Sequence, residues 1–197
     1  RLPGDAAIGH VRYSTAGGNE AANVQPFCVR WKDGQVAIAH NGNLTNALPL
    51  RDELEAQGAI FQSTTDSEVV IQLIARSQEA KFCDSVIDAL RKVEGAYTVV
   101  VTNGDCVVAA RDPLGFRPLW LGRVGDAYIL ASETCALDLI DAKWVRDIEP
   151  GEMLVIDAKG ARSVRPFADS PRAHCVFEHV YFARPDSYVF GQSVNEV

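Results

Sequence analysis

Runs of apolar, β-branched and aromatic residues between turn signals predict several short β-strands, at residues 27–31, 35–39, 96–102, 106–110, 128–131 and 152–156. Asp33-Gly34 and Asn103-Gly104 each separate two of these runs and favour the positive φ angles of tight turns, so two antiparallel hairpins are expected. The stretch 97–101 is almost continuously apolar, which is typical of a strand covered on both faces. A layered sandwich is therefore predicted.

Apolar residues spaced three and four apart predict helices over 48–57, from 65 onward, and over 84–93. Thr65 and Glu68 have the spacing of a capping box, in which each side chain bonds the other residue's backbone N–H. The apolar stripe that follows Glu68 is expected to face a sheet.

The composition is that of an ordinary globular domain, with 197 residues, 47% of them hydrophobic and 23% charged. A net charge of −7 argues against sequence-independent nucleic-acid binding, which needs clustered cations. No apolar run approaches the roughly 20 residues that span a bilayer, and no signal peptide opens the sequence, so no membrane partner and a cytoplasmic location are expected.

The five cysteines are widely spaced and form no CxxC pair, which predicts reduced thiols and neither a disulfide framework nor a zinc site. Cys28 and Cys106 lie in apolar runs and are interpreted as small buried hydrophobes.

Arg12 and Asp66 together have the charges needed to bind a free amino acid. An arginine fork suits the α-carboxylate, and a carboxylate suits the ammonium group. Taken singly, each has a plainer interpretation: Arg12 as a surface ion-pair partner, and Asp66 as a first-turn carboxylate favoured by the helix dipole.

Asn41-Gly42 follows a predicted strand and offers an amide side chain beside an unobstructed backbone N–H. Two such donors can stabilise the oxyanion that forms when a nucleophile attacks a carboxamide. Asn-Gly is also a common tight-turn dipeptide, and this alternative stays open.

Two loops have two interpretations each. The polar segment 12–23 is either a closing lid or a plain surface loop. The segment 111–119, Arg-Asp-Pro-Leu-Gly-Phe-Arg-Pro-Leu, is either part of a site or a rigid turn with ionic latches, and the structural role is favoured.

Four segments, 9–17, 40–44, 65–68 and 111–119, resemble in order and spacing the glutaminase domain of the class II, Ntn-type glutamine amidotransferases. The resemblance implies an α+β fold, a four-layer αββα sandwich that is incomplete at the N-terminus, and hydrolysis of glutamine to glutamate and ammonia. It assigns Arg12 to the glutamine carboxylate, Asp66 to its ammonium group, Asn41 and Gly42 to the oxyanion hole, and Thr15 to the lid.

Residues 181–187, Tyr-Phe-Ala-Arg-Pro-Asp-Ser, most resemble the family members that commit phosphoribosyl pyrophosphate to purine synthesis. This implies a glutaminase domain at 1–183, a connector at 184–197, and a phosphoribosyltransferase domain of the same polypeptide beyond it. The resemblance also implies a homo-oligomer at full length, with magnesium and in some members an iron–sulfur cluster, for which Cys175 is a candidate ligand.

The family's nucleophile is an N-terminal cysteine, whereas this sequence begins Arg-Leu-Pro and its first cysteine is Cys28. We interpret the sequence as an interior piece of a longer enzyme and expect the chain alone to be inactive. Two alternatives stay open: a noncatalytic glutamine-binding module, and a sister enzyme that makes glucosamine 6-phosphate or asparagine.

Overall fold

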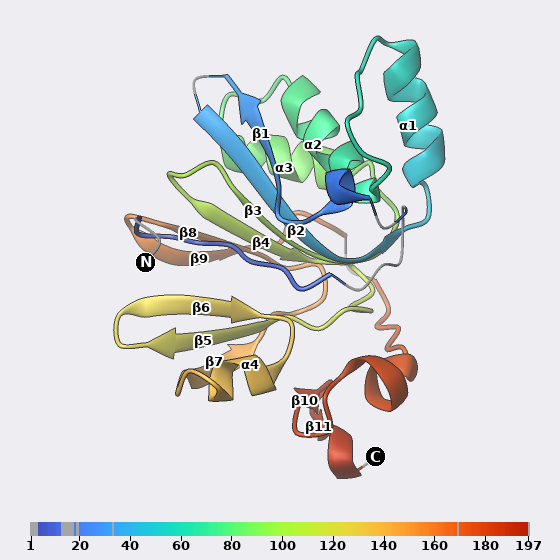
Figure 1. Ribbon diagram of the computed structural model, residues 1–197. Coiled ribbons are helices and arrows are strands. Elements are labelled where there is room, and N and C mark those ends of the chain that lie inside the picture. Colours follow the sequence, from blue (N-terminus) through green and yellow to red (C-terminus); the bar gives the residue numbers. More distant parts are fainter. Residues whose placement is uncertain (1–3, 13–17, 19, 33, 169, 197) are drawn as a thin grey trace. The chain divides into compact units, whose positions relative to one another are not determined.

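The computed structural model describes residues 4–12, 18, 20–32, 34–168 and 170–196 (Figure 1). The chain divides into two compact units. Unit 1 contains Arg1–Gly95 and Val99–Val108, and unit 2 contains Ala96–Thr98 and Ala109–Val197.

Among its described residues, unit 1 holds a short 3₁₀ helix (Ala21–Asn23), the first hairpin and three α-helices. Its elements are β1 (Phe27–Trp31), β2 (Gly34–Leu44), α1 (Ala47–Ala56), α2 (Asp66–Arg76), α3 (Phe82–Leu90) and most of β3 (Gly95–Thr102). Strands β1 and β2 pair antiparallel from Phe27 opposite Ile38 to Trp31 opposite Gly34, which confirms the first predicted hairpin. Helix α2 packs on both strands and on α1 and α3.

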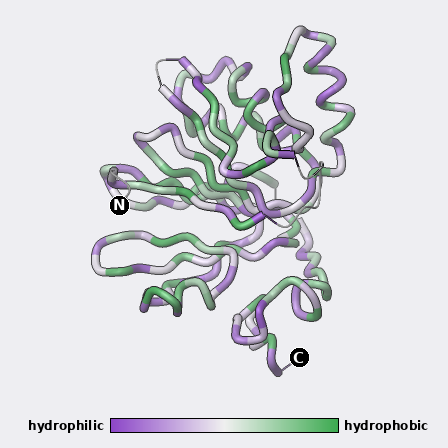
Figure 2. The backbone as a smooth tube through the Cα atoms, viewed as in Figure 1, coloured by the Kyte–Doolittle hydropathy of each residue, from purple (hydrophilic) through white to green (hydrophobic). Residues whose placement is uncertain are grey.

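The helices of unit 1 form where the spacing of apolar residues predicts them. Along α1 the tube alternates between hydrophilic and hydrophobic turns (Figure 2). In α2 the apolar stripe, which includes Val69, Val70 and Ile74, is buried. Because this stripe packs on β1 and β2, α2 holds its N-terminal turn against the sheet.

Helix α2 begins as predicted, but its cap differs. Thr65 is the N-cap, and its side chain accepts from the Ser67 N–H at 3.3 Å. The predicted capping box is wrong, because the Glu68 carboxylate accepts instead from the backbone N–H groups of Gln62 at 2.8 Å and Ser63 at 2.7 Å. Glu68 therefore fixes the loop that leads into the helix.

Unit 2 contains the remaining elements: most of β4 (Val107–Arg111), then β5 (Trp120–Val124), β6 (Ala127–Ala131), α4 (Thr134–Asp138), β7 (Lys143–Asp147), β8 (Met153–Asp157), β9 (Gly160–Val164), a π-helix (Glu178–Phe182), β10 (Tyr188–Val189) and β11 (Gln192–Ser193). The largest sheet has the strand order β1-β2-β3-β4-β8-β9, and β6-β5-β7 form a second sheet. The C-terminal residues pack on α4, where Thr134 Oγ1 accepts from the Tyr188 N–H at 2.8 Å.

Three sequence-based expectations need correction. Strand β2 continues to Leu44, so Asn41-Gly42 lies in a strand and the tight-turn alternative is wrong. Cys28 is exposed, because β1 alternates and points Phe27 inward instead. Strands β5, β7 and β9 and helix α4 were not predicted. All five cysteines are free in the structure, and their reduced state stays a prediction.

Candidate functional site

The carboxylate of Asp66 bonds β2 on both sides of Asn41-Gly42. Asp66 Oδ2 accepts from the Leu44 N–H at 2.9 Å, and Oδ1 lies 3.4 Å from Nδ1 of His40. Asp66 is only 7% exposed and opens helix α2. The structure thus attaches one proposed recognition residue to the segment of β2 that carries the two proposed oxyanion donors.

Hydroxyl groups complete the surroundings of this carboxylate. Thr65 Oγ1 lies 3.4 Å and Ser67 Oγ 3.5 Å from Asp66 Oδ1, and Ser67 Oγ is also 3.3 Å from His40 Nδ1. Burial opposes ionisation of Asp66, but the bonds from His40, Leu44 and Thr65 outweigh it and hold the pKa of Asp66 below its ordinary value. Asp66 is therefore a carboxylate at neutral pH, ready to accept from a cation.

Asn23 ties the loop of Arg12 to the entrance of α2. Its side chain donates to Thr64 Oγ1 and to the Gly18 carbonyl oxygen, both at 2.9 Å, and accepts from the Thr64 N–H at 2.9 Å. The same Gly18 carbonyl accepts from Arg12 Nη2 at 3.1 Å. Arg12 and Asp66 thus lie on segments joined through one fully buried asparagine, which the sequence analysis did not identify.

The strand that carries Asn41 and Gly42 is fixed by a further side chain. Gln25 Oε1 accepts from the His40 N–H at 2.7 Å, so the start of the segment is anchored to the residues before β1. Asn41 and Gly42 are partly exposed, and Gly42 has a φ of 147°. A side chain at Gly42 would be strained in that conformation, which explains the need for glycine.

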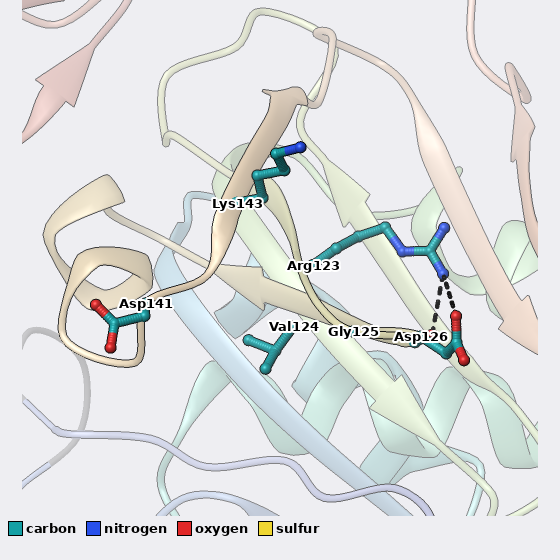
Figure 3. Close-up of a pocket in the computed structure, with 6 residues that line it drawn as sticks. All are labelled: Arg123, Val124, Gly125, Asp126, Asp141 and Lys143. Carbon is teal, nitrogen blue, oxygen red and sulfur yellow. Dashed lines mark hydrogen bonds and ion pairs between the residues drawn. The ribbon is translucent and has the colours of Figure 1, made fainter.

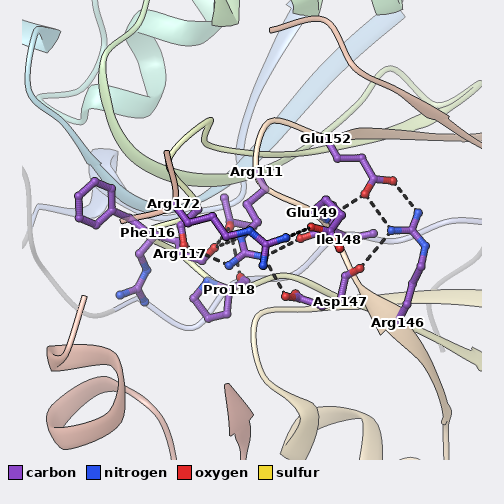
Figure 4. Close-up of polar contacts among 12 residues, drawn as sticks. Arg111, Phe116, Arg117, Pro118, Arg146, Asp147, Ile148, Glu149, Glu152 and Arg172 are labelled. Atoms are coloured by element: carbon purple, nitrogen blue, oxygen red, sulfur yellow. Dashed lines mark hydrogen bonds and ion pairs between the residues drawn. The ribbon is translucent and has the colours of Figure 1, made fainter. Parts of the chain in front are cut away.

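The segment 111–119 forms the ionic latch that the sequence favours, within unit 2 (Figure 4). Arg111 is 1% exposed and donates to the carbonyl oxygens of Arg117 at 2.7 Å, Ile148 at 2.6 Å and Gly115 at 3.1 Å. Its Nη1 also donates to Asp147 at 3.0 Å. The Asp112 carboxylate accepts from the N–H groups of Phe116 at 3.0 Å and Arg117 at 3.2 Å. The structural interpretation of this segment is confirmed.

A cavity of about 570 Å³ lies in unit 2, lined by Arg123, Val124, Gly125, Asp126, Asp141 and Lys143 (Figure 3). Two cations and two carboxylates line it, and Arg123 already donates to the Asp126 carbonyl oxygen at 3.1 Å. None of the predicted site residues lines this cavity.

The remaining candidates stand as follows. Thr15 lies outside the described residues, so its lid role stays a prediction. Cys175 is partly exposed and lies three residues before the π-helix. Among the described residues, no three His, Cys, Asp or Glu side chains form a group that could hold a metal ion, so Cys175 has no companion ligands there. No helix within the described part of the chain is long and apolar enough to cross a membrane.

The fold and site define a class of protein. Residues 10–139 match the glutamine amidotransferase domain, and the chain therefore belongs to that family. Two solved structures superimpose closely. The Bacillus subtilis glutamine phosphoribosylpyrophosphate amidotransferase, complexed with ADP and GMP, has a TM-score of 0.89 at 44% identity over 94% of this chain. A structure described as the allosteric regulatory enzyme of purine biosynthesis has a TM-score of 0.90 at 46% identity over 94% of this chain. These matches confirm the expected α+β fold, the αββα sandwich of Ntn type.

The similar curated proteins narrow the class to amidophosphoribosyltransferases. The chloroplastic amidophosphoribosyltransferase 2 of Arabidopsis thaliana is 50% identical over all 197 residues, which are 35% of its own length. The Bacillus subtilis enzyme is 45% identical over 99% of this chain and 41% of its own length. Both solved structures are likewise covered over 40% of their chains. The chain thus spans well under half the length of the relatives it matches.

Proposed function

We propose that this chain is the glutamine-hydrolysing portion of an amidophosphoribosyltransferase, which supplies ammonia from glutamine to phosphoribosyl pyrophosphate in purine nucleotide biosynthesis. The observation that supports this proposal is the double attachment of Asp66 to His40 and Leu44, which lie on either side of Asn41-Gly42 in β2. The identity of 43–51% to amidophosphoribosyltransferases favours this activity over synthesis of glucosamine 6-phosphate or asparagine.

The residue roles follow from charge and position. Asp66 binds the glutamine ammonium group, and Arg12 binds the α-carboxylate through its planar fork. The Asn41 side chain and the Gly42 N–H stabilise the oxyanion that forms when a thiolate attacks the amide carbon. Collapse of that intermediate releases ammonia and leaves a thioester, which water hydrolyses to glutamate.

The decisive experiment uses the complete gene product and compares two nitrogen donors. Asp66→Asn should lower kcat/KM for glutamine about 100-fold, because a bond between two charged groups is lost, while synthesis from free ammonia stays nearly unchanged. Asp88→Asn is the matched control, since Asp88 makes a helix-surface pair with Lys92 at 3.0 Å. Equal losses with both donors would show that Asp66 only supports the fold.

The nucleophile in this proposal is an N-terminal cysteine, and no cysteine of the 197-residue sequence precedes Cys28. We therefore infer that this chain by itself is inactive. Ammonia release by the purified 197-residue chain should equal that of a blank without protein. Turnover that survives replacement of all five cysteines would refute the assigned chemistry.

This proposal includes several partners and cofactors. They are a phosphoribosyltransferase domain of the same polypeptide, magnesium, a homo-oligomeric assembly and, if Cys175 acquires companion ligands, an iron–sulfur cluster. A cytoplasmic location stays a prediction, and the Arabidopsis relative is named chloroplastic.

A noncatalytic glutamine-binding module is the second candidate, because the charges of Arg12 and Asp66 suit binding of glutamine and do not by themselves supply a nucleophile. The same assay separates the two functions. A complete gene product that binds glutamine in calorimetric titration, yet releases no ammonia from it, would favour the second candidate.

A further inference from the structure

His40 is the residue immediately before the proposed oxyanion donors, and its side chain is buried at 1% exposure. The ring nitrogen Nδ1 lies 3.4 Å from Asp66 Oδ1 and 3.3 Å from Ser67 Oγ. The resemblance to the family assigns no role to this histidine. Its backbone is fixed as well, since the His40 N–H donates to Gln25 Oε1 at 2.7 Å.

We propose that His40 is a positioning residue for glutamine: its Nδ1–H holds the Asp66 carboxylate in the orientation that receives the substrate ammonium group. This inference rests on the proposed role of Asp66. His40 acts through Asp66 and need not touch the substrate.

The chemistry of the His40–Asp66 pair determines which ring nitrogen of His40 donates the hydrogen bond. An ionised carboxylate only accepts hydrogen bonds, so an attractive contact requires the proton on Nδ1. Nε2 is buried and has no hydrogen-bond partner among the described residues. The polar role of the ring is therefore concentrated at Nδ1.

The position of the His40–Asp66 pair explains how His40 orients the Asp66 carboxylate. Asp66 Oδ1 meets His40 and Oδ2 meets the Leu44 N–H, so the carboxylate bridges two points of β2 and cannot rotate without losing one bond. Loss of the His40 contact leaves Oδ1 with only the Thr65 and Ser67 hydroxyls, at 3.4 and 3.5 Å, and leaves Leu44 as the remaining bond between the carboxylate and β2. A recognition group held so loosely binds its ligand less well.

The test uses two substitutions that place an amide at different ring positions. The Asn side chain reaches the position of Nδ1, and the Gln side chain reaches that of Nε2. In the complete gene product, His40→Asn should stay within about 5-fold of the parent KM for glutamine. His40→Gln should raise that KM about 10- to 100-fold, the range expected for loss of one hydrogen bond to a charged group. Synthesis from free ammonia should be unchanged in both variants.

A double-mutant cycle completes the test. If His40 acts through Asp66, His40→Gln should cause little further loss in an Asp66→Asn background. His174→Gln is the matched control, because His174 stacks on Phe190 in unit 2 with ring centroids 4.0 Å apart and should leave glutamine use unaltered.

The outcomes separate the two proposals. Equal effects of His40→Asn and His40→Gln, additivity with Asp66→Asn, or a parallel fall in ammonia-dependent synthesis would each overturn the positioning role. If Asp66→Asn itself leaves glutamine use intact, the proposed function of Asp66 fails first. Failure of the His40 variants alone leaves that function standing.

Discussion

Replacing Arg111 with Met should strongly destabilise unit 2. The methionine side chain fills much of the same volume but donates no hydrogen bonds. The substitution leaves the carbonyl oxygens of Gly115, Arg117 and Ile148 without this donor and removes the cation beside Asp147. Burial already raises the pKa of Asp147 despite the attraction of Arg111, so this carboxylate depends on its partner.

The expected loss of stability for Arg111→Met is estimated from the ion pair and from the carbonyl oxygens. Removing one member of a fully buried ion pair costs about 3–5 kcal/mol, and the lower end of this range applies here because the Asp147 side chain is 33% exposed. Protonation of Asp147 relieves part of this cost, whereas each unsatisfied carbonyl adds about 1 kcal/mol. We expect a loss of about 4 kcal/mol for Arg111→Met. Arg111→Lys should lose about 2 kcal/mol, because an ammonium keeps the charge but cannot reproduce the fork.

Hydrogen–deuterium exchange of the complete gene product measures this loss of stability at individual backbone amides. The amides of Phe116 and Arg117, which donate to Asp112, lie in the segment that Arg111 closes. Their opening free energy should fall by the stated amounts. Arg172→Met is the control, since Arg172 is 63% exposed and its pair with Glu149 is worth at most about 1 kcal/mol. If Arg111→Met and Arg172→Met change exchange equally, the latch contributes no more than a surface pair and the reasoning is refuted.

Two further predictions concern Glu178 and Gly95. Burial raises the pKa of Glu178 to about 7, although its ion pair with Arg117 at 2.6 Å opposes the rise, so the folded state holds this proton more tightly than the unfolded state. The resulting stability is present at pH 4.5 and below and is lost as the pH rises to 7; Glu178→Gln should remove this dependence, worth up to about 3 kcal/mol in denaturant unfolding. Gly95 has a φ of 134°, and an added Cβ would lie 2.9 Å from Leu44 Cα and Thr45 N. Gly95→Ala should therefore cost about 3 kcal/mol and impair glutamine use, whereas Gly34→Ala, with no atom within 4 Å of the added Cβ, should be tolerated in a thermal melt.

The elements predicted from the sequence are those specified by local patterns. The β1–β2 hairpin follows from its two apolar runs, although Gly34 of the predicted turn dipeptide already pairs with Trp31 as the first residue of β2; helix α2 follows from its apolar spacing and Thr65 cap. Strand β7 was missed because Lys143, Trp144 and Val145 are all exposed, so no inward alternation marks it. Its pairing with β5 shifts register between Leu121 and Gly122, which further obscures a periodic signal. Long-range pairing determines this strand.

In the candidate site, too, some residues are predictable from local motifs and others only from long-range contacts. Asp66 and Asn41 stand out in the sequence because their neighbours form recognisable motifs. Asn23 does not stand out, since its structural role is a hydrogen bond to Thr64, which lies 41 residues away in the sequence. His40 was visible within its motif, but only the fold shows that its ring meets Asp66 rather than solvent. Contacts of this kind need the folded backbone.

Asp66 can serve both as a first-turn carboxylate of helix α2 and as the proposed acceptor for the substrate ammonium group. The Leu44 N–H occupies one acceptor position on Oδ2, and a carboxylate oxygen has two. Within the described residues, the His40, Thr65 and Ser67 side chains gather at Oδ1 instead, so Oδ2 retains capacity for a further donor. An ammonium group bound there would complete the carboxylate without displacing its bonds to β2. In the function that we propose, the bonds that fix Asp66 to β2 thus also fix the distance between the ammonium acceptor and the oxyanion donors Asn41 and Gly42 on the same strand.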